Sequence, residues 1–406
     1  MVRYLTPFGF LALVPLGAWL GGIGTFLAAA ATPLALALLD SVLGEGSATA
    51  GKTNARWIPR LYIVAQLGVT AWAAVQTASP RTSLLDALGL TLSTGVVTGV
   101  SGFLAAHEMI HSRDRRERGL GLLFLASVFY MQFRVAHPYG HHRNAATPAD
   151  PASAGLGETL YAFLARSVGG QVREAWCFEA RRTRAKRGIN RLLVYFAIEA
   201  ALLLTVALVS LRAAAFLVAV AVIAIALLES FNYVAHYGLT RRIGPDGRPE
   251  PLAPQHSWNS GRRMNNAALF NMGRHSDHHR HAARSYDRLE PCAGAAELPC
   301  GYAGAILLAI IPPLWRHVMD PRAMAAMTAA RVLYPSQSTG GAGSRLRTAL
   351  GLPIPCSSVI QCKERESDDE ESTSQADSVT LAAEGAAIRQ RRTGNSLRIS
   401  KESNSC

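Results

Sequence analysis

Long apolar stretches separated by short polar connections run along most of the chain. The first stretch, from about Leu5 to Leu43, is interrupted by Gly21, Gly22 and Gly24, which predicts two membrane spans joined by a tight turn. We expect no cleaved signal peptide, because this apolar core is too long and no small-residue cleavage site followed by a soluble domain is present.

Two further pairs of apolar stretches have the length and the short turn of helical hairpins. They cover about Trp57 to Ala78 with Leu84 to Ala106, and about Leu192 to Leu211 with Ala213 to Phe231, turning at Arg81 and Arg212. The pattern therefore predicts an all-α integral membrane protein with about six transmembrane helices in three hairpins. The weaker stretches Leu120 to Phe133 and Ala303 to Trp315 are too short to span, and we expect them to cap the bundle.

Composition supports a membrane location. Of the 406 residues 49% are apolar and 17% charged, and the mean hydropathy is +0.15, which is too apolar for an ordinary soluble enzyme. The net charge of +13 does not indicate nucleic-acid binding, because the basic residues stand in short loops between apolar runs. The six cysteines form no CxxC pair, so neither a disulfide framework nor a thiolate metal site is expected.

Basic residues at the hairpin ends share one predicted side of the membrane, and the opposite side has only turns of a few residues. By the positive-inside rule the basic side is cytoplasmic, whether in a plasma or inner membrane or in the endoplasmic reticulum. The residues are Lys52, Arg56, Arg60, Arg113, Arg115, Arg116, Arg118, Arg181, Arg182, Arg184, Lys186, Arg187, Arg241 and Arg242.

The composition changes near Ser336 to Ser, Gly, Thr and mixed charge, with the acidic run from Ser367 to Ser372. Such a segment lacks the apolar residues needed for a core. We therefore expect one membrane domain over residues 1–335 and a disordered tail over residues 336–406.

Nine of the twelve histidines fall in four compact groups, each at or just beyond the predicted cytoplasmic end of a span. The motif HEMIH places two imidazoles on one helix face, because residues four apart are neighbours there. The groups are His107 and His111 in HEMIH; His137, His141 and His142 in HPYGHH; His236 in NYVAHYG; and His275, His278 and His279 in RHSDHH.

So many imidazoles near one membrane face indicate metal ions, because without a metal their nitrogens lack partners or repel one another. Imidazole suits iron, copper, zinc and nickel, so the ligand type does not name the metal. Nine ligands are too many for one ion and fit two ions of four to five ligands each.

Two other interpretations of the histidines remain open on the residues alone. HEMIH also matches H-E-x-x-H, in which two histidines bind zinc and Glu108 acts as the general base of an intramembrane metalloprotease. That reading needs only one further ligand and leaves HPYGHH and RHSDHH without a purpose. Alternatively the histidines cap helix ends in a transporter or scaffold.

The motifs HEMIH, HPYGHHRNAATPADPAS, NYVAHYGL and GRHSDHHRHAARSYDRL resemble those of the membrane alkane hydroxylases, the alkane 1-monooxygenases, within the fatty acid desaturase and hydroxylase superfamily. The resemblance covers about Arg56 to Arg322, and NYVAHYGL and RHSDHH favour hydroxylases over desaturases. It implies insertion of one atom of O2 into a terminal C–H bond of an alkane or alkyl chain at a centre of two iron ions. An acyl-lipid desaturase or hydroxylase with the same metal site is the alternative within the superfamily.

The resemblance also implies which residues act. The family's iron ligands fall on all nine clustered histidines, and His256, His281 and His317 lie outside that set. Carboxylates and amides near the motifs are candidates to orient the ligand imidazoles, since a metal-bound histidine usually donates its other N–H to an acceptor. These candidates are Glu108, Asp277, Asp150 and Asn232, with His281 as a further one.

Two departures and one missing component complete the comparison with the family. Where the family commonly has Glu before the histidine of the second and third motifs, this chain has Ala136 and Ala235, so substrate or rate is expected to differ. No flavin fingerprint, haem CxxCH motif or CxxC knuckles are present, so electrons must come from a separate carrier. By resemblance it is a rubredoxin or ferredoxin with its reductase, docking on the basic face.

Overall fold

The computed structural model describes residues 2–46, 55–186 and 188–333, and these are almost entirely helical. Over this part of the chain the only sheet is a parallel pair of two-residue strands, β1 (Trp258–Asn259) and β2 (Ala296–Glu297). The all-α class is thereby confirmed. The predicted tail over residues 336–406 lies outside the described residues, as do Lys52 and Arg187.

Within the described residues, five helices are long and apolar enough to cross a membrane. They are Gly22–Leu43, Trp57–Ala78, Leu84–Ile110, Arg191–Val209 and Leu211–His236. The sixth predicted span is α1 (Thr6–Leu20), whose 15 residues extend only about 22 Å, less than the hydrocarbon thickness of about 30 Å. The six-span count is therefore not confirmed, although α1 and α2 (Leu27–Leu43) do form the predicted first hairpin around η2 (Gly22–Phe26).

Two glycines allow close contact between neighbouring helices of the bundle. A Cβ on Gly95 would lie 2.8 Å from Cβ of Ile223, and one on Gly99 would lie 2.8 Å from Cβ of Leu227. These contacts bring α4 (Leu84–Val97) and the π-helical turn η3 (Thr98–Gly102) against α11 (Leu211–His236). Because α5 (Phe103–Ile110) continues from η3, its end and the end of α11 come to the same side of the bundle.

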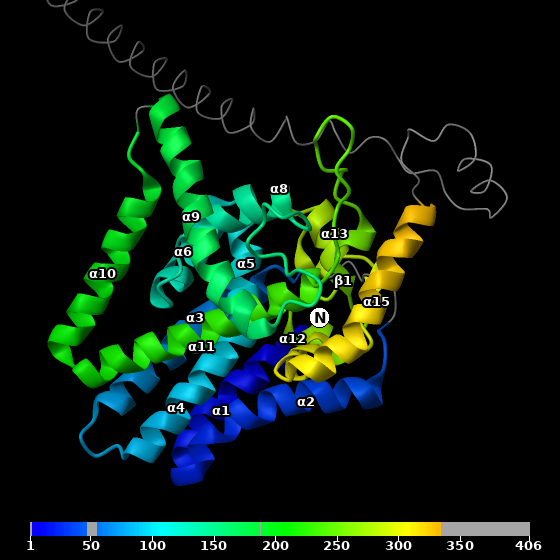
Figure 1. The fold of residues 1–406 in the computed structure, drawn as a ribbon. Helices are drawn as coiled ribbons and strands as arrows, with labels where there is room; N and C mark the ends of the chain where they lie inside the picture. The colour runs from blue at the N-terminus through cyan, green and yellow to red at the C-terminus, as the bar shows by residue number, and fades with distance from the viewer. Residues whose placement is uncertain (1, 47–54, 187, 334–406) are drawn as a thin grey trace, which may run out of the picture. The chain divides into compact units, whose positions relative to one another are not determined.

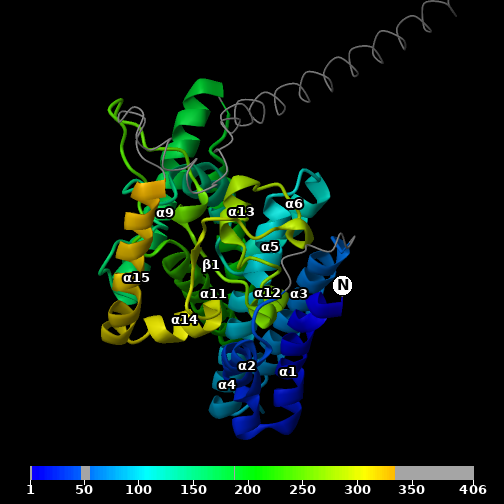
Figure 2. The same ribbon diagram turned by 90° about the vertical axis from the view of Figure 1, so that its right-hand side faces the viewer.

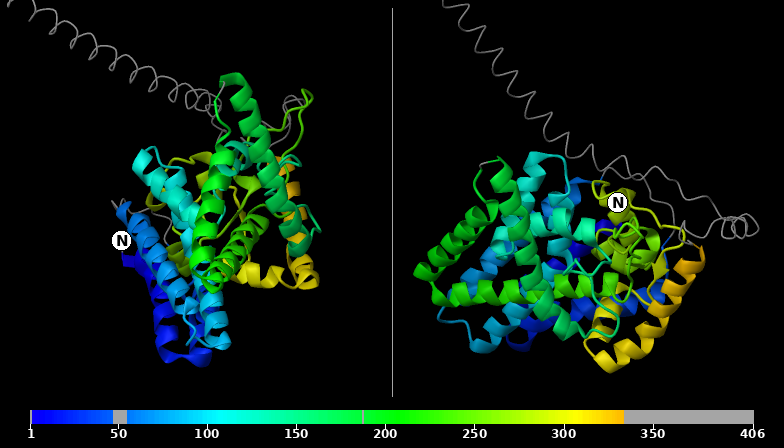
Figure 3. Two further views of the ribbon diagram at one scale, coloured as in Figure 1. Left: turned by 90° about the vertical axis from the view of Figure 1, so that its left-hand side faces the viewer. Right: turned by 45° about the horizontal axis from the view of Figure 1, so that its top comes forward.

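The hairpin turns gather at the opposite end. Arg212 donates from Nη1 to the carbonyl of Ser79 and from Nη2 to the carbonyl of Thr82, both at 2.9 Å, so the turn of the third hairpin touches that of the second. α10 (Arg191–Val209) ends where Ser210 caps α11, and Arg212 thus stands in the first turn of α11 rather than in the connection. Figures 1 and 3 show α1, α2, α3 (Trp57–Ala78) and α4 side by side in blue and cyan, leading away from α13.

Short helices cover the end of the bundle that carries the histidines (Figures 1 and 2). They are α6 (Arg115–Ser127), α7 (Phe133–Val135), η4 (Ala136–His141), α8 (His142–Asn144), η5 (Pro254–His256), α12 (Arg263–Ala268), α13 (His275–Arg280), η6 (Tyr286–Arg288) and α14 (Tyr302–Ala309). The two weak apolar stretches predicted as capping segments are α6 with α7, and α14 with the start of α15 (Pro312–Leu333). The sequence analysis did not anticipate α9 (Leu160–Lys186), a 27-residue helix that contacts α11 and η4.

Candidate metal centre

Helical spacing presets the first pair of histidines. His107 lies in the last turn of α5 and His111 follows as its C-cap, so the two rings share one face with centroids 4.7 Å apart. The π-helical turn η3 lies one turn upstream on the same helix, and such turns often occur next to functional sites.

The second group comes from the irregular helical segment η4 and α8. His137, His141 and His142 are all buried, and Phe133 stacks on the ring of His137 with centroids 4.7 Å apart. The remaining ligand candidates come from α11 and α13. His236 ends α11, and the i, i+3, i+4 spacing along α13 turns its three histidines toward the same interior.

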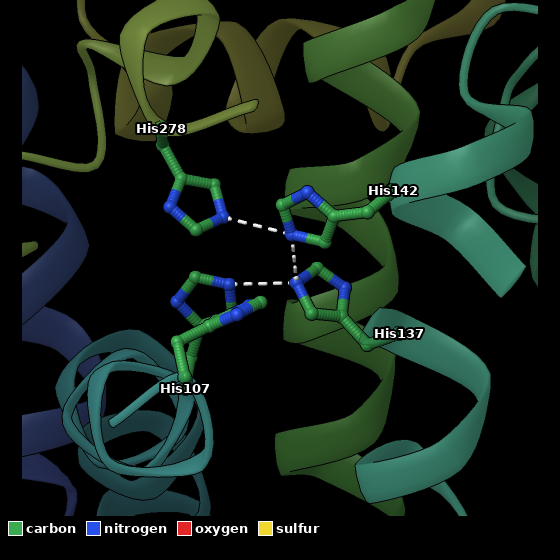
Figure 4. Close-up of side chains that lie close together, drawn as sticks. His107, His137, His142 and His278 are labelled. Atoms are coloured by element: carbon green, nitrogen blue, oxygen red, sulfur yellow. Dashed lines mark hydrogen bonds between the residues drawn. The ribbon is translucent and has the colours of Figure 1, made fainter. Parts of the chain in front are cut away.

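The four segments converge, and the nine rings form two groups in which the facing ring nitrogens lie within 4.8 Å of one another. Figure 4 shows four rings of the first group pointing at one another from separate segments. Every member is buried except the half-buried His111. Group one is His107, His111, His137, His142 and His278, and group two is His141, His236, His275 and His279.

Hydrogen bonds among the imidazoles do not account for the short distances between ring nitrogens in group two. The Nε2 atoms of His236, His275 and His279 form a triangle with sides of 3.2, 3.2 and 3.0 Å. A ring nitrogen is either a donor or an acceptor, so at least one side of any such triangle joins two donors or two acceptors. Two nitrogen ligands about 2.1 Å from one ion and about 90–100° apart would be about 3.0–3.2 Å from each other. The spacing therefore fits a shared metal ion.

Five imidazole nitrogens of the clustered histidines are buried without a hydrogen-bond partner among the described residues, and two of them, Nε2 of His141 and Nε2 of His111, point to the same conclusion. His141 Nδ1 donates to Asp150 at 2.8 Å, so the Nε2 of His141 presents a lone pair, and this atom has no hydrogen-bond partner. The Nε2 of His111 is likewise buried and unpartnered. A buried polar atom without a partner costs free energy, and a metal ion in each group would remove that cost.

Electrostatics keeps most of these rings in the neutral form that binds metals. Burial, followed by the neighbouring positively charged groups, holds the pKa well below its usual value at six of them. These six are His111, His137, His142, His275, His278 and His279. Burial also lowers the pKa of His141, but the Asp150 carboxylate outweighs this effect, and the pKa of His141 is raised overall. The pKa of Asp150 is lowered in turn by its interaction with His141.

Of the five residues predicted to support the ligands, only Asp150 hydrogen-bonds to one of the nine clustered imidazoles. Asp277 instead accepts from Nδ1 of His281 at 2.9 Å and from Arg284 at 2.8 Å, which ties the loop after α13. Asn232 donates to Glu229 at 3.4 Å. Glu108 accepts from the backbone N–H of Tyr286 at 3.2 Å rather than from a clustered imidazole.

Three groups that help to form the surroundings of the histidines were not predicted from the sequence. The backbone carbonyl of His256 accepts from Nδ1 of His236 at 3.1 Å, which no residue-type pattern reveals. Glu229, fully buried within the span α11, accepts from Ser167 at 2.6 Å and from Gln171 at 2.8 Å, and thereby joins α11 to α9. A carboxylate inside an apolar span is itself a signal of function that could have identified it.

Glu174 on α9 is the third missed residue. Its Oε1 accepts from Asn144 at 2.8 Å, while its Oε2 is buried without a partner. A side chain on Gly140 would collide with this carboxylate, so the glycine between His137 and His141 leaves room for the Glu174 side chain.

The two alanines that replace glutamate in the resembled family are both fully buried. Ala136 packs with Val135, Ala175 and Leu192, and Ala235 belongs to the main apolar core. An alanine supplies no carboxylate at either position.

One cavity reaches the centre from the basic face. It has a volume of about 150 Å³ and is lined by His111 and Glu108 together with the guanidinium groups of Arg56, Arg113 and Arg284. His111, the half-buried ligand candidate, is thus the histidine of group one that adjoins this cavity.

Comparison with known proteins yields one family and several relatives. Residues 83–305, which contain all nine clustered histidines, match the fatty acid desaturase family model. The chain is 41% identical over 267 residues to alkane 1-monooxygenase 2 of Pseudomonas aeruginosa, covering 64% of this chain and 71% of that protein. It is 38% identical to the alkane 1-monooxygenase of Acinetobacter baylyi, covering 66% and 65% of the two chains. The hydroxylase component of the xylene/toluene monooxygenase of Pseudomonas putida is 28% identical, with 74% and 82% covered.

Proposed function

Since the chain belongs to the fatty acid desaturase family, and within it to the alkane hydroxylases, we propose that it is a membrane monooxygenase holding two iron ions in its histidine groups. Its reaction is hydroxylation of a terminal C–H bond of an alkane or alkyl chain with O2 and two external electrons. The observation that carries this proposal is the convergence of nine imidazoles into groups of five and four.

The all-imidazole donor set suits iron, and two irons would supply the chemistry of inserting one oxygen atom into an inert C–H bond while the other leaves as water. The chain's own contribution is to hold and orient the ligands. Asp150 and the carbonyl of His256 fix the tautomers of His141 and His236, so that both present Nε2 inward. Burial keeps most of the rings neutral.

Apolar rings on the bundle side of the groups suit a hydrocarbon substrate. Phe133 stacks on His137, and Phe231 contacts His275 with centroids 5.5 Å apart. An alkyl chain entering from the bilayer would be bound by burial, at about 0.8 kcal/mol for each methylene. Both phenyl rings are positioned to border the end of such a chain.

We propose that the histidine end of the bundle faces the cytoplasm, because the arginines that follow His111 and those that follow His236 both lie at this end. Arg241, for example, donates to the carbonyl of Arg143, next to His142, at 3.0 Å. An electron carrier of the rubredoxin or ferredoxin type, with its reductase, would find a basic surface there.

The acyl-lipid desaturase and the zinc metalloprotease, the two alternative enzymes, are not favoured. The relatives named above are monooxygenases, and this supports an alcohol rather than an alkene as the product. A zinc protease would need the Glu108 carboxylate at the metal, whereas this group accepts a hydrogen bond from Tyr286.

The test uses the full chain purified in detergent, with iron and zinc measured before assay. Octane, hexadecane and palmitoyl lipids are supplied under labelled dioxygen with a rubredoxin or ferredoxin and its reductase. We expect iron in the protein and labelled alcohol from an alkyl substrate, and a His278→Ala variant serves as the inactive control. Zinc in place of iron, or an alkene as the only product, would overturn the proposal.

A further inference from the structure

Three oxidisable rings lie together just beyond His236, outside both histidine groups. Tyr237 follows His236 in the chain, and its ring centroid is 5.1 Å from that of Trp315 and 5.2 Å from that of Tyr233. The centroids of Tyr233 and Trp315 are 5.5 Å apart, so each ring contacts the other two. All three side chains are buried.

The polar atoms of these rings are arranged in a way that packing alone does not require. Tyr237 Oη donates to a carboxylate oxygen of Asp320 at 2.6 Å and accepts from the backbone N–H of Gly157 at 3.0 Å. Nε1 of Trp315 is buried and has no hydrogen-bond partner within the described part of the chain. A buried indole N–H without a partner costs about 1–3 kcal/mol, which an apolar phenylalanine ring would not incur.

We propose that Tyr237, Trp315 and Tyr233 form an electron relay that protects the enzyme when the metal centre has been oxidised by O2 and no substrate is bound. The inference rests on the proposed function, since it needs a centre that reacts with O2. Without a C–H bond to attack, a centre of irons oxidised by O2 would draw electrons from the groups around it, and these would be its own imidazoles. The relay supplies an electron from the protein in their place.

The chemical step balances within the named groups. If the centre held iron oxidised by O2, Tyr237 would give up one electron and pass its phenol proton along the 2.6 Å hydrogen bond to Asp320, which leaves a neutral tyrosyl radical. Trp315 could then reduce Tyr237: the proton on Asp320 would return to the Tyr237 oxygen in the same step, and Trp315 would become a cation radical that keeps its N–H proton. A soluble thiol would return the electron to Trp315, becoming a thiyl radical and releasing its own proton.

The cluster begins at the residue that directly follows a clustered histidine. Tyr237 and His236 are adjacent residues, so their Cα atoms are about 3.8 Å apart. Asp320 on α15 is half-buried, so the Tyr237–Asp320 pair is the part of the cluster nearest to solvent. Phe133 and Phe231, the rings in contact with the histidines themselves, are not readily oxidised and so do not compete.

The experiment uses the iron-loaded full chain, reduced and then exposed to O2 without alkane. For the wild type we expect an organic radical in the electron paramagnetic resonance spectrum and, by mass spectrometry, oxidation products on the three rings. Tyr237→Phe should lose the tyrosyl signal and inactivate several-fold faster per O2 exposure, with more oxidation on the histidine segments. Its initial rate with saturating alkane should be unchanged.

Conservative variants separate a relay from a packing role. Trp315→Phe should shorten the enzyme's lifetime without alkane, whereas Trp315→Tyr, which keeps an oxidisable ring, should restore it. Tyr62→Phe, which removes the hydroxyl of a buried tyrosine in α3, is the matched control and should behave as wild type.

Two results overturn the relay while leaving the proposed function standing. One is a wild type that makes alcohol but forms no tyrosyl or tryptophanyl radical without alkane. The other is a set of variants that all inactivate at the wild-type rate. A wild type that holds iron but never makes alcohol would instead contradict the proposed function, and the relay with it.

Discussion

Replacing Asp150 with asparagine removes the one carboxylate that contacts a clustered histidine. The Asp150 side chain is buried and accepts from three donors: Nδ1 of His141 at 2.8 Å, Oγ of Ser153 at 2.6 Å and the backbone N–H of Ala152 at 3.0 Å. Asparagine has one carbonyl oxygen, so its NH2 group must face at least one of these donors.

The size of the effect follows from these contacts. A hydrogen bond to a charged group contributes about 1.5–3 kcal/mol, and a factor of ten in affinity corresponds to about 1.4 kcal/mol. Asp150→Asn should therefore weaken iron binding in group two by about 10–100-fold, which is the range typical of lost outer partners of metal ligands. Group one does not contact Asp150 and should keep its iron.

Chelator titration of the purified protein, followed by iron analysis, measures this difference. We expect the variant to lose one iron per chain at a chelator concentration that leaves both irons in the wild type. Asp40→Asn is the matched control, because Asp40 is equally buried and accepts from backbone N–H groups of Met264 and Asn265 instead of a histidine. Equal iron retention in Asp150→Asn and wild type would refute the role given to this carboxylate.

The remaining predictions concern packing, protonation and the role of Glu108. Gly170→Ala should lower the free energy of unfolding by about 1–3 kcal/mol and weaken iron binding, because the new Cβ would lie 2.5 Å from Cβ of Pro151, next to Asp150. Gly169→Ala is the matched control: a Cβ there meets open space, so this variant should be neutral or stabilising in thermal unfolding. In the folded metal-free protein, burial holds the pKa of six clustered histidines below the value of about 6.5 that they have in the unfolded chain, so below that pH the unfolded chain binds more protons than the folded one. The free energy of unfolding of the metal-free protein should therefore fall as the pH drops through about 6.5. A melting temperature independent of pH would contradict this. Glu108→Gln should keep both irons and most hydroxylation in the product assay, since an amide oxygen still accepts from Tyr286; loss of the metal would count against it.

Much of the fold could be predicted because hydrophobic length is a strong signal in a membrane protein. The span Trp57–Ala78 has the predicted bounds, and the first hairpin turns at the predicted glycines. The helix from Leu84 runs on to Ile110, beyond the predicted Ala106, because the polar residues of HEMIH continue it into the cap. α9 was missed because its mixed polar surface gives neither a span pattern nor a motif.

The convergence of the histidines was predictable from clustering, whereas their division into two groups was not. His141 and His142 are adjacent in sequence but belong to different groups, because successive side chains on a helical turn point in different directions. The outer partners depend on tertiary contacts: Asp150 reaches His141 through a loop, and the carbonyl of His256 reaches His236 from another. Glu108 and Asp277, which stand beside histidines in sequence, face other partners.

The central claim is that separate segments share a pair of irons through their imidazole nitrogens. Mössbauer and X-ray absorption spectroscopy of the iron-loaded full chain test it most directly. The account predicts two irons per chain, each surrounded by several imidazole nitrogens at about 2.1 Å. A single iron per chain, or iron bound mainly by carboxylate oxygen or sulfur, would contradict it.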